Sequence, residues 1–314
     1  MLNAPFRVAP FFRTRPWGAR DLSPWYDYKV SQSPDVEPIG EVWLTGDQCV
    51  VETGACAGMT LDQATRANAV DLLGAGHANG AQFPLLMKVL FPREKLSVQV
   101  HPDDVMAQKY GEPRGKTECW YALDAEEGAK VALGMKPGST PETVASAIQS
   151  HTLEGMLDWL PVHKGDMFFV DAGTVHAIGP GSVLLETQQN SDATYRLYDY
   201  GRPRELHLDK SFEAMRMQTG AGRVPSTIDG DGAEILLASK YFRVERIRFF
   251  DGAARKRLDA VQMLFCAVGG LVIDGEGFAP VRLERGQLAV IPASCGNWRL
   301  QAEAGSEAIR AIAC

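Results

Sequence analysis

An alternating run in the first third of the chain limits what this protein can fold into. Residues 95–101 read KLSVQVH, so aliphatic and polar side chains alternate along the segment. In a β-strand this period of two places Ser97, Gln99 and His101 on one face and the aliphatic residues on the other. A polar row that contains Gln and His, backed by an aliphatic row, suits the wall of a wet cavity. We therefore expect a β protein that carries a ligand or metal site on this strand.

Other short alternating or apolar runs predict further strands. They lie at residues 41–45, 85–90, 118–123, 167–170, 183–187, 241–249, 263–268 and 287–291. Helical signals are fewer: a capping-box pattern from Thr60 to Gln63 predicts a helix that ends at Gly74, and Pro141 opens a helix predicted to end near Trp159. Two shorter helices are expected at residues 102–110 and 209–217. The chain is thus predicted to be mainly β, with a few short helices.

A weak internal repeat suggests two related domains. Gly165 precedes a strand, a turn and His176, and Gly286 precedes a similar unit that reaches Asn297 at the same spacing. The first unit resembles the second motif of the cupin superfamily, whose small β-barrels mount a metal among strands. Residues 220–232 are rich in Gly, Pro and Asp, so we predict a metal-binding cupin domain over residues 1–219 and a degenerate cupin-like domain over residues 233–314. Because Asn297 replaces the histidine, the second domain is expected to bind no metal.

Composition excludes several classes of protein. The 314 residues carry a formal net charge of -7, which disfavours nucleic acid as a partner because phosphates require a basic surface. No apolar run reaches signal-peptide or membrane-span length, so a cytoplasmic location without membrane partners is expected. The six cysteines form no C-x-x-C pair, which disfavours a cysteine zinc site.

The candidate ligands come from three separate segments. Gln99 and His101 lie two residues apart, so their side chains leave one strand side by side. Glu118 shares a strand face with Lys116, and His176 follows the Gly165 unit. Two imidazoles, one carboxylate and one amide oxygen suit Zn²⁺ or another divalent first-row metal better than Mg²⁺ or Ca²⁺. Such a set leaves a coordination position open for substrate.

Four segments resemble type I mannose-6-phosphate isomerase. They are PLLMKVLFPREKLSVQVHPDD at residues 84–104, GKTECWYALD at 115–124, FFVDAGTVHAIG at 168–179 and LETQQNSDATYRLYDYGR at 185–202. With PWG and EVWLTG near the start, the resemblance extends over roughly the first two-thirds of the chain, whose length is similar to that of the short bacterial form.

This resemblance implies an activity and a set of site residues. The activity is the interconversion of mannose 6-phosphate and fructose 6-phosphate through an enediolate, with one Zn²⁺ per chain. The implied metal ligands are Gln99, His101, Glu118 and His176. The implied catalytic residues are Arg196, Lys116 and Glu186, and the implied substrate contacts are Ser97 for the phosphate and Lys88, Glu41 and Trp17 along the cavity.

Several alternatives stay open at this level. The general base is either Glu186 or Lys116. Other divalent first-row metals could replace zinc, and the oligomeric state is undetermined. Two rival functions are a metal-dependent cupin oxygenase, because iron cupins also use His and Glu ligands, and a non-catalytic sugar-phosphate-binding cupin. For the isomerase and for the non-catalytic binding protein, the expected partner is a small sugar phosphate.

Overall fold

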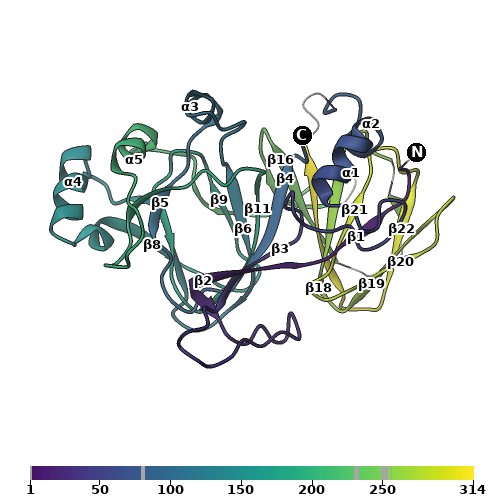
Figure 1. Ribbon diagram of the computed structural model, residues 1–314, viewed down its shortest axis with the longest axis horizontal. Coiled ribbons are helices and arrows are strands. Elements are labelled where there is room, and N and C mark those ends of the chain that lie inside the picture. The colour runs from purple at the N-terminus through teal and green to yellow at the C-terminus, as the bar shows by residue number, and fades with distance from the viewer. Residues whose placement is uncertain (1, 79–81, 230–232, 249–253, 256) are drawn as a thin grey trace.

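Four β-sheets stack side by side along the long axis of the molecule (Figure 1). The computed structural model describes residues 2–78, 82–229, 233–248, 254–255 and 257–314. Two sheets belong to the N-terminal half and two to the C-terminal half. The mainly β fold predicted from the sequence is confirmed, and the two sheet pairs agree with the predicted pair of cupin-like barrels.

The N-terminal half pairs a five-stranded sheet with a seven-stranded sheet. The outer N-terminal sheet has the order β12 (Tyr195–Tyr198), β5 (Val98–Val100), β10 (His176–Ile178), β7 (Lys130–Met135) and β8 (Leu157–Pro161). The inner N-terminal sheet has the order β13 (Gly222–Val224), β9 (Met167–Val170), β6 (Glu118–Ala125), β11 (Ser182–Gln189), β4 (Leu85–Leu90), β3 (Ile39–Trp43) and β2 (Phe11–Ala19).

The C-terminal half repeats this arrangement. The inner C-terminal sheet has the order β1 (Phe6–Val8), β21 (Leu288–Ile291), β18 (Gln262–Val268), β23 (Glu307–Ala313), β16 (Phe242–Arg248), β15 (Glu234–Ala238) and β14 (Thr227–Ile228). The outer C-terminal sheet has the order β17 (Ala254–Arg255), β22 (Trp298–Ala302), β19 (Gly270–Gly275) and β20 (Val281–Glu284). The first strand of the chain, β1, therefore pairs with β21 of the opposite half.

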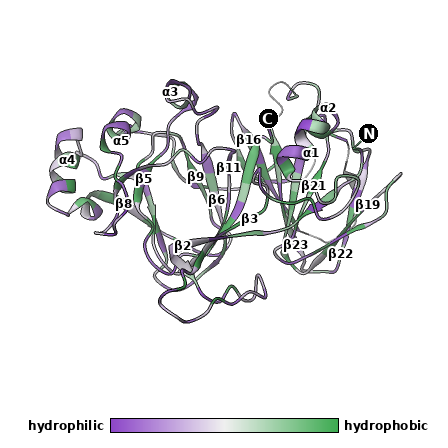
Figure 2. Ribbon diagram, in the orientation of Figure 1, coloured by the Kyte–Doolittle hydropathy of each residue, from purple (hydrophilic) through white to green (hydrophobic). Residues whose placement is uncertain are grey.

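Separate hydrophobic cores fill the spaces between the layers. One core, with Trp120 and Phe168, lies between the two N-terminal sheets, and another, with Trp298, lies between the two C-terminal sheets. The largest core joins the halves and includes Tyr121 of β6 and Phe265 of β18. Figure 2 shows that the hydrophobic colour follows the strands, while α3 and α4 carry hydrophilic turns. Alternation along each strand thus supplies one face to a barrel interior and the other face to a neighbouring layer.

The strand pairing near residues 220–232 bears on the predicted domain boundary. β13 pairs with β9 in the N-terminal half, whereas β14 pairs with β15 in the C-terminal half. The chain therefore passes from one half to the other between Val224 and Thr227. Residues 230–232 of this stretch lie outside the described residues, and the division into domains 1–219 and 233–314 remains a prediction.

Short helices flank the sheets. They are α1 (Leu61–Ala67), α2 (Ala69–Leu73), α3 (Asp104–Lys109), α4 (Pro141–Gln149), the 3₁₀ helix η1 (Leu153–Met156) and α5 (Leu208–Ala214). Residues of α4 and α5 pack with Val98 and Val100 of β5 in one core, so the aliphatic face of that strand is buried beneath helices. None of the helices within the described ranges is long and apolar enough to cross a membrane.

Several predicted helix boundaries differ from the structure; the helix expected at residues 209–217, for example, ends at Ala214. The helix opened by Pro141 was predicted to end near Trp159, but it ends at Gln149 because His151 adopts a left-handed φ of 57°. Trp159 lies instead on β8, opposite Ala132 of β7.

The helix predicted from Thr60 to Gly74 is divided at Asn68. This residue caps α1 and precedes α2, and its side-chain amide donates to the carbonyl oxygen of Ala64 at 3.1 Å. The predicted capping box is present: Thr60 Oγ1 accepts from Gln63 N, and Gln63 Oε1 accepts from Thr60 N. Gly74 ends α2 with a positive φ of 89°, as its position in the sequence predicts.

The contribution of the Thr60 cap to stability can be tested by substitution. Thr60→Ala should lower the free energy of unfolding by about 1 kcal/mol, because it leaves a backbone N–H at the start of α1 without its acceptor. Urea denaturation measures the change. Thr60→Ser keeps the hydroxyl and should stay close to the parent protein. Equal destabilisation by the two variants would contradict the assigned cap.

Candidate active site

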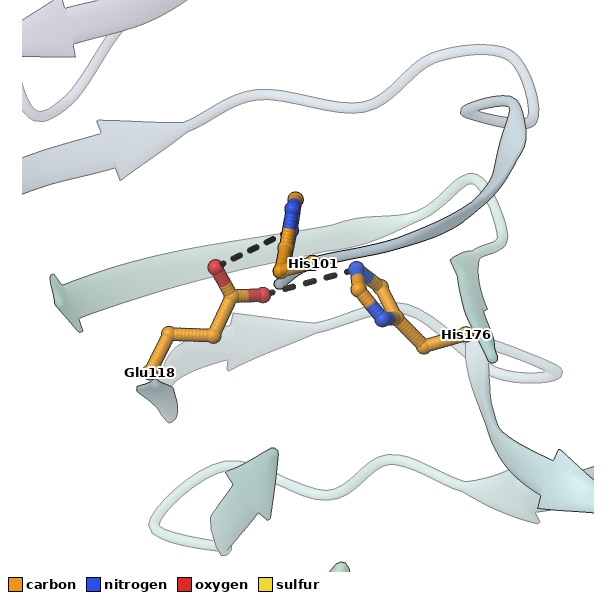
Figure 3. Close-up of side chains that lie close together, drawn as sticks. All are labelled: His101, Glu118 and His176. Atoms are coloured by element: carbon orange, nitrogen blue, oxygen red, sulfur yellow. Dashed lines mark ion pairs between the residues drawn. The ribbon is translucent and has the colours of Figure 1, made fainter. Parts of the chain in front are cut away.

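Two histidines and a glutamate meet inside the N-terminal barrel. Possible ligand atoms of His101, Glu118 and His176 all lie within 4.8 Å of one another, and all three residues are buried. Glu118 Oε2 lies 3.4 Å from His101 Nε2, and Glu118 Oε1 lies 3.6 Å from His176 Nε2. Figure 3 shows the carboxylate with one oxygen directed at each imidazole ring. His101 directly follows β5, Glu118 begins β6 and His176 begins β10.

Hydrogen bonds to main-chain oxygens orient both rings. His101 Nδ1 lies 2.9 Å from Ala193 O, and His176 Nδ1 lies 2.9 Å from Thr174 O. Because a carbonyl oxygen only accepts, each Nδ1 carries the proton and each Nε2 presents a lone pair to Glu118. Burial lowers the pKa of both histidines, that of His176 to about 4, so both rings are neutral near pH 7.

This donor set fits a divalent cation. Two neutral imidazole nitrogens and a carboxylate converge, and the opposite nitrogen of each ring is fixed by a second partner, as in protein metal sites. The Lys116 ammonium also lies in this cluster, with Nζ 3.0 Å from Glu118 Oε2 and 3.0 Å from His101 Nε2. The cluster is therefore built to surround positive charge.

Gln99 lies next to the cluster. It pairs with His176 across β5 and β10, and its Nε2 lies 3.2 Å from His176 Nε2, while its Oε1 accepts from Ser97 Oγ at 3.2 Å. Exchanging the oxygen and nitrogen positions of this amide would present Oε1 to the cluster. Arg196 of β12 pairs with Gln99 from the other side, so both side chains leave the same face of the sheet.

A cavity of about 500 Å³ opens beside this cluster. Its lining includes Gln99 and Glu118 together with every catalytic and substrate residue expected from the sequence: Trp17, Glu41, Lys88, Ser97, Lys116, Glu186 and Arg196. Trp17 both lines the cavity and packs in the barrel core. These residues come from β2, β3, β4, β5, β6, β11 and β12 and from the segments beside β5 and β6.

The alternation in residues 95–101 is only partly regular in the structure. β5 is limited to Val98–Val100, and Ser97 and Gln99 line the cavity as the pattern predicts. Leu96 was expected on the aliphatic face, but it also lines the cavity. It lies outside the strand, where its N–H donates to Ile178 O at 2.9 Å, so the period of two does not extend to it.

Charges alternate along one wall of the cavity. Arg15 donates to Glu41 with two nitrogens at 3.1 and 3.0 Å. Lys88 lies directly across from Glu186 between β4 and β11, with Nζ 3.3 Å from Glu186 Oε1, and Lys116 Nζ lies 3.8 Å from the same oxygen. Each buried charge thus has an opposite charge beside it, which offsets the cost of desolvation.

This wall shifts the pKa values of its carboxyl groups in opposite directions. Burial alone would raise the pKa of Glu41, but Lys88 and Arg15 outweigh it and lower the pKa to about 2. Burial and the Glu118 carboxylate raise the pKa of Glu186 to about 7. Burial opposes the charge of Lys88, yet Glu186 and Glu41 raise the pKa of its ammonium. Glu41 is therefore fixed as an anion, whereas Glu186 is able to exchange a proton near neutral pH.

The sequence interpretation missed two arginines that line the cavity, Arg15 and Arg204. Arg15 precedes Trp17 by two residues on β2, so alternation could have pointed to it. Arg204 lies in an irregular loop without a periodic signal, where Asp199 accepts from its Nε and Nη2 at 2.6 Å each. Asp199 itself is buried, so it anchors the arginine from behind.

Comparisons with known proteins identify the family of this chain. Residues 6–136 match the family described as phosphomannose isomerase type I, catalytic domain. A mannose-6-phosphate isomerase of Bacillus subtilis is 34% identical over 96% of this chain and 97% of the relative. One from Streptococcus mutans is 32% identical over 91% of this chain and 92% of the relative. The chain belongs to the mannose-6-phosphate isomerase family. Membership makes it an isomerase, which argues against the oxygenase and the non-catalytic binding protein.

Solved structures of mannose-6-phosphate isomerases share the fold across both halves. The Bacillus subtilis enzyme aligns with a TM-score of 0.87 and 30% identity, covering 98% of this chain and 99% of that one. A mannose 6-phosphate isomerase bound with zinc and yttrium aligns with a TM-score of 0.76 and 17% identity, covering 98% and 99% of the two chains. The likeness to the second structure concerns the fold alone.

The depressed pKa of Glu41 predicts how stability depends on pH. A folded pKa of about 2, below the ordinary 4.5, stabilises the fold above pH 4.5, and this contribution is lost as pH falls toward 2. Glu41→Gln leaves Arg15 and Lys88 without this carboxylate, so it should destabilise the protein most above pH 4.5. The difference from the parent in free energy of unfolding should shrink as the pH falls toward 2, as measured by urea titrations.

An exposed carboxylate gives the control for this test. Glu37 lines the same cavity but is exposed, so Glu37→Gln should change the free energy of unfolding little at any pH in this range. A constant difference between Glu41→Gln and the parent across the range would contradict the assigned pairing.

Proposed function

We propose that this protein is a zinc-dependent aldose–ketose isomerase that interconverts mannose 6-phosphate and fructose 6-phosphate through an enediolate. The observation that carries the proposal is the buried His101, Glu118 and His176 cluster at one end of a cavity lined by several cations. Family membership supplies the substrate, because the relatives are named for it. The cavity of about 500 Å³ is of a size that takes a small ligand such as a sugar phosphate.

We assign the metal to Gln99, His101, Glu118 and His176. The neutral rings and the adjacent carboxylate support this assignment, and a related isomerase has been solved with bound zinc. Two nitrogens and two oxygens suit one Zn²⁺, with other divalent first-row metals as alternatives. When bound, such a cation would supply Lewis-acid stabilisation of negative charge that develops on substrate oxygens.

The reaction moves a proton between C2 and C1 of the open-chain sugar, so it requires a base. We assign this role to Glu186. Its Oε1 is buried and has no hydrogen-bond partner among the described residues, and its pKa of about 7 lies near the working range of a general base. Lys88 and Lys116 lie on either side of Oε1, where their charges stabilise the carboxylate once it has given up the proton.

The remaining cations would bind the negative charges of the substrate. Lys116 lies between Glu118 and Glu186, so it is placed to stabilise charge at the reacting carbons. Arg196 Nε is buried without a hydrogen-bond partner among the described residues, which leaves it free to bind an anionic oxygen. Ser97 and Arg204 line the same cavity and would contribute to the phosphate site.

Metal removal tests the first assignment. Enzyme treated with a chelator should lose mannose 6-phosphate isomerase activity and regain it with Zn²⁺, because the ligand cluster would have no cation to balance Glu118 and polarise substrate. A coupled assay for fructose 6-phosphate, with metal analysis of each sample, makes the measurement. His176→Ala should bind less zinc, whereas the exposed His163 offers the control His163→Ala. Full activity in a demonstrably metal-free sample would refute the metal role.

Replacement of the two candidate bases tests the second assignment. Glu186→Gln should lower kcat by about 10² to 10⁴-fold and abolish the acidic limb of the pH profile, because activity requires the deprotonated carboxylate. Lys116→Met should also lower kcat, but it should keep an acidic limb. Steady-state kinetics from pH 5 to 9 separate the two outcomes, and Glu205→Gln, at an exposed site, is the control. An acidic limb that persists in Glu186→Gln would exclude Glu186 as the base.

A further inference from the structure

Hydrogen bonds from three segments converge on Asp104, the first residue of α3. Asp104 lies three residues after His101, and its Oδ1 accepts from Gly115 N at 2.9 Å and from Gln189 Nε2 at 2.9 Å. Its Oδ2 accepts from the hydroxyl of Tyr241 at 2.8 Å. One carboxylate therefore connects the His101 segment, the segment that leads into β6, the end of β11 and the C-terminal half of the chain.

The segment that carries Lys116 is held closely against the His101 segment. Lys116 N donates to Pro102 O at 3.0 Å, and a Cβ added to Gly115 would lie only 2.7 Å from the same oxygen. Gln189 completes the contact, because its Oε1 accepts from Thr117 N at 2.9 Å. Gln189 and Thr117 are both buried. The main chain that leads to Lys116 and Glu118 is thus held by hydrogen bonds to Pro102, Asp104 and Gln189.

Tyr241 is itself firmly placed by the C-terminal half. It directly precedes β16, its N–H donates to Ser239 Oγ at 3.3 Å, and its carbonyl oxygen accepts from Cys314 N at 3.0 Å. Burial and the Asp104 carboxylate raise the pKa of the Tyr241 hydroxyl, so it stays a donor near neutral pH. Burial acts to raise the pKa of Asp104, but hydrogen bonds from Gln189, Gly115 and Tyr241 lower it overall. The contact is a hydrogen bond to a charged acceptor, which is stronger than a neutral one.

We propose that Tyr241 is a positioning residue through which the C-terminal half of the chain holds Lys116 and Glu118 in place against His101. The proposal rests on the proposed function, and it gives the degenerate barrel a role in the active site of the other barrel. Tyr241 does not line the cavity and touches no reacting atom. It acts through Asp104, the neighbouring main chain and Gln189.

Removal of single polar groups tests the connection. Tyr241→Phe deletes only the hydroxyl, and it should lower kcat for mannose 6-phosphate about threefold to tenfold with KM within twofold, because small displacements of reacting groups lower the rate steeply. Asp104→Asn should lower kcat about tenfold to a hundredfold. Lys240→Met is the matched control: Lys240 is exposed, adjacent to Tyr241 and 3.9 Å from Asp104 Oδ2, so kcat should be unchanged.

Zinc affinity is a second measurement of the effect of each variant, and it does not depend on turnover. If Glu118 is held through Asp104, Tyr241→Phe and Asp104→Asn should weaken Zn²⁺ binding about tenfold in competition with a chromophoric chelator, whereas Lys240→Met should bind as the parent does. All measurements are made on the full-length protein well below the thermal unfolding midpoint of each variant. A general loss of stability would lower that midpoint without changing zinc affinity or kcat at the assay temperature.

Two results would overturn the proposal. One is parental kcat and zinc affinity in Tyr241→Phe, even if Asp104→Asn is impaired, because the Tyr241 hydroxyl would then have no positioning role. The other is an equal loss in Lys240→Met, which would show that charge beside Asp104, and not the Tyr241 hydroxyl, accounts for the effect. Failure of the proposed function looks different, since the unmodified protein would then not isomerise mannose 6-phosphate at all.

Discussion

The buried carboxylate of Glu118 is the constraint on which the rest of the site depends. An ionised carboxyl group at this depth is strongly unfavourable unless positive charge and polar groups surround it. Lys116 at 3.0 Å meets part of this requirement, whereas the two imidazoles direct unprotonated nitrogens, which cannot donate to the carboxylate, toward it. The hydrogen bonds of those rings to main-chain oxygens then fix the tautomers. A cation-binding centre follows from the need to compensate one charge.

The layered fold makes such a centre possible inside a β protein. Each N-terminal sheet presents aliphatic side chains to a neighbouring layer, so its other face is free to be polar where the barrel opens. On β5, Val98 packs beneath helices while Gln99 faces the cavity. On β6, Tyr121 joins the core between the halves while Trp120 packs inside the barrel against His176, with ring centroids 5.6 Å apart. The hydrophobic cores thus stabilise both faces of these sheets, while the polar side chains of the site face the cavity.

The two halves of the chain are joined by more than a linker. β1 adds the N-terminus to the inner C-terminal sheet, and a shared core lies between the inner sheets. Polar contacts also cross the boundary, since Tyr121 donates to Glu307 at 2.7 Å and Tyr241 donates to Asp104 at 2.8 Å. These contacts are the route by which we propose that the C-terminal half positions residues of the cluster.

The sequence by itself determined the local features. The period of two predicted the strand bearing Gln99, and the pattern from Thr60 to Gln63 predicted a helix start, because both depend on neighbours within a few residues. The candidate ligands also came from short motifs, whereas the catalytic and substrate-binding roles came from the family resemblance. The sequence did not predict that Arg204 lines the cavity or that Tyr241 contacts Asp104. Arg204 lies in an irregular loop, and Tyr241 precedes a strand of another sheet. Only the tertiary structure decided those contacts, since packing of the sheets brings together residues as far apart as Asp104 and Tyr241.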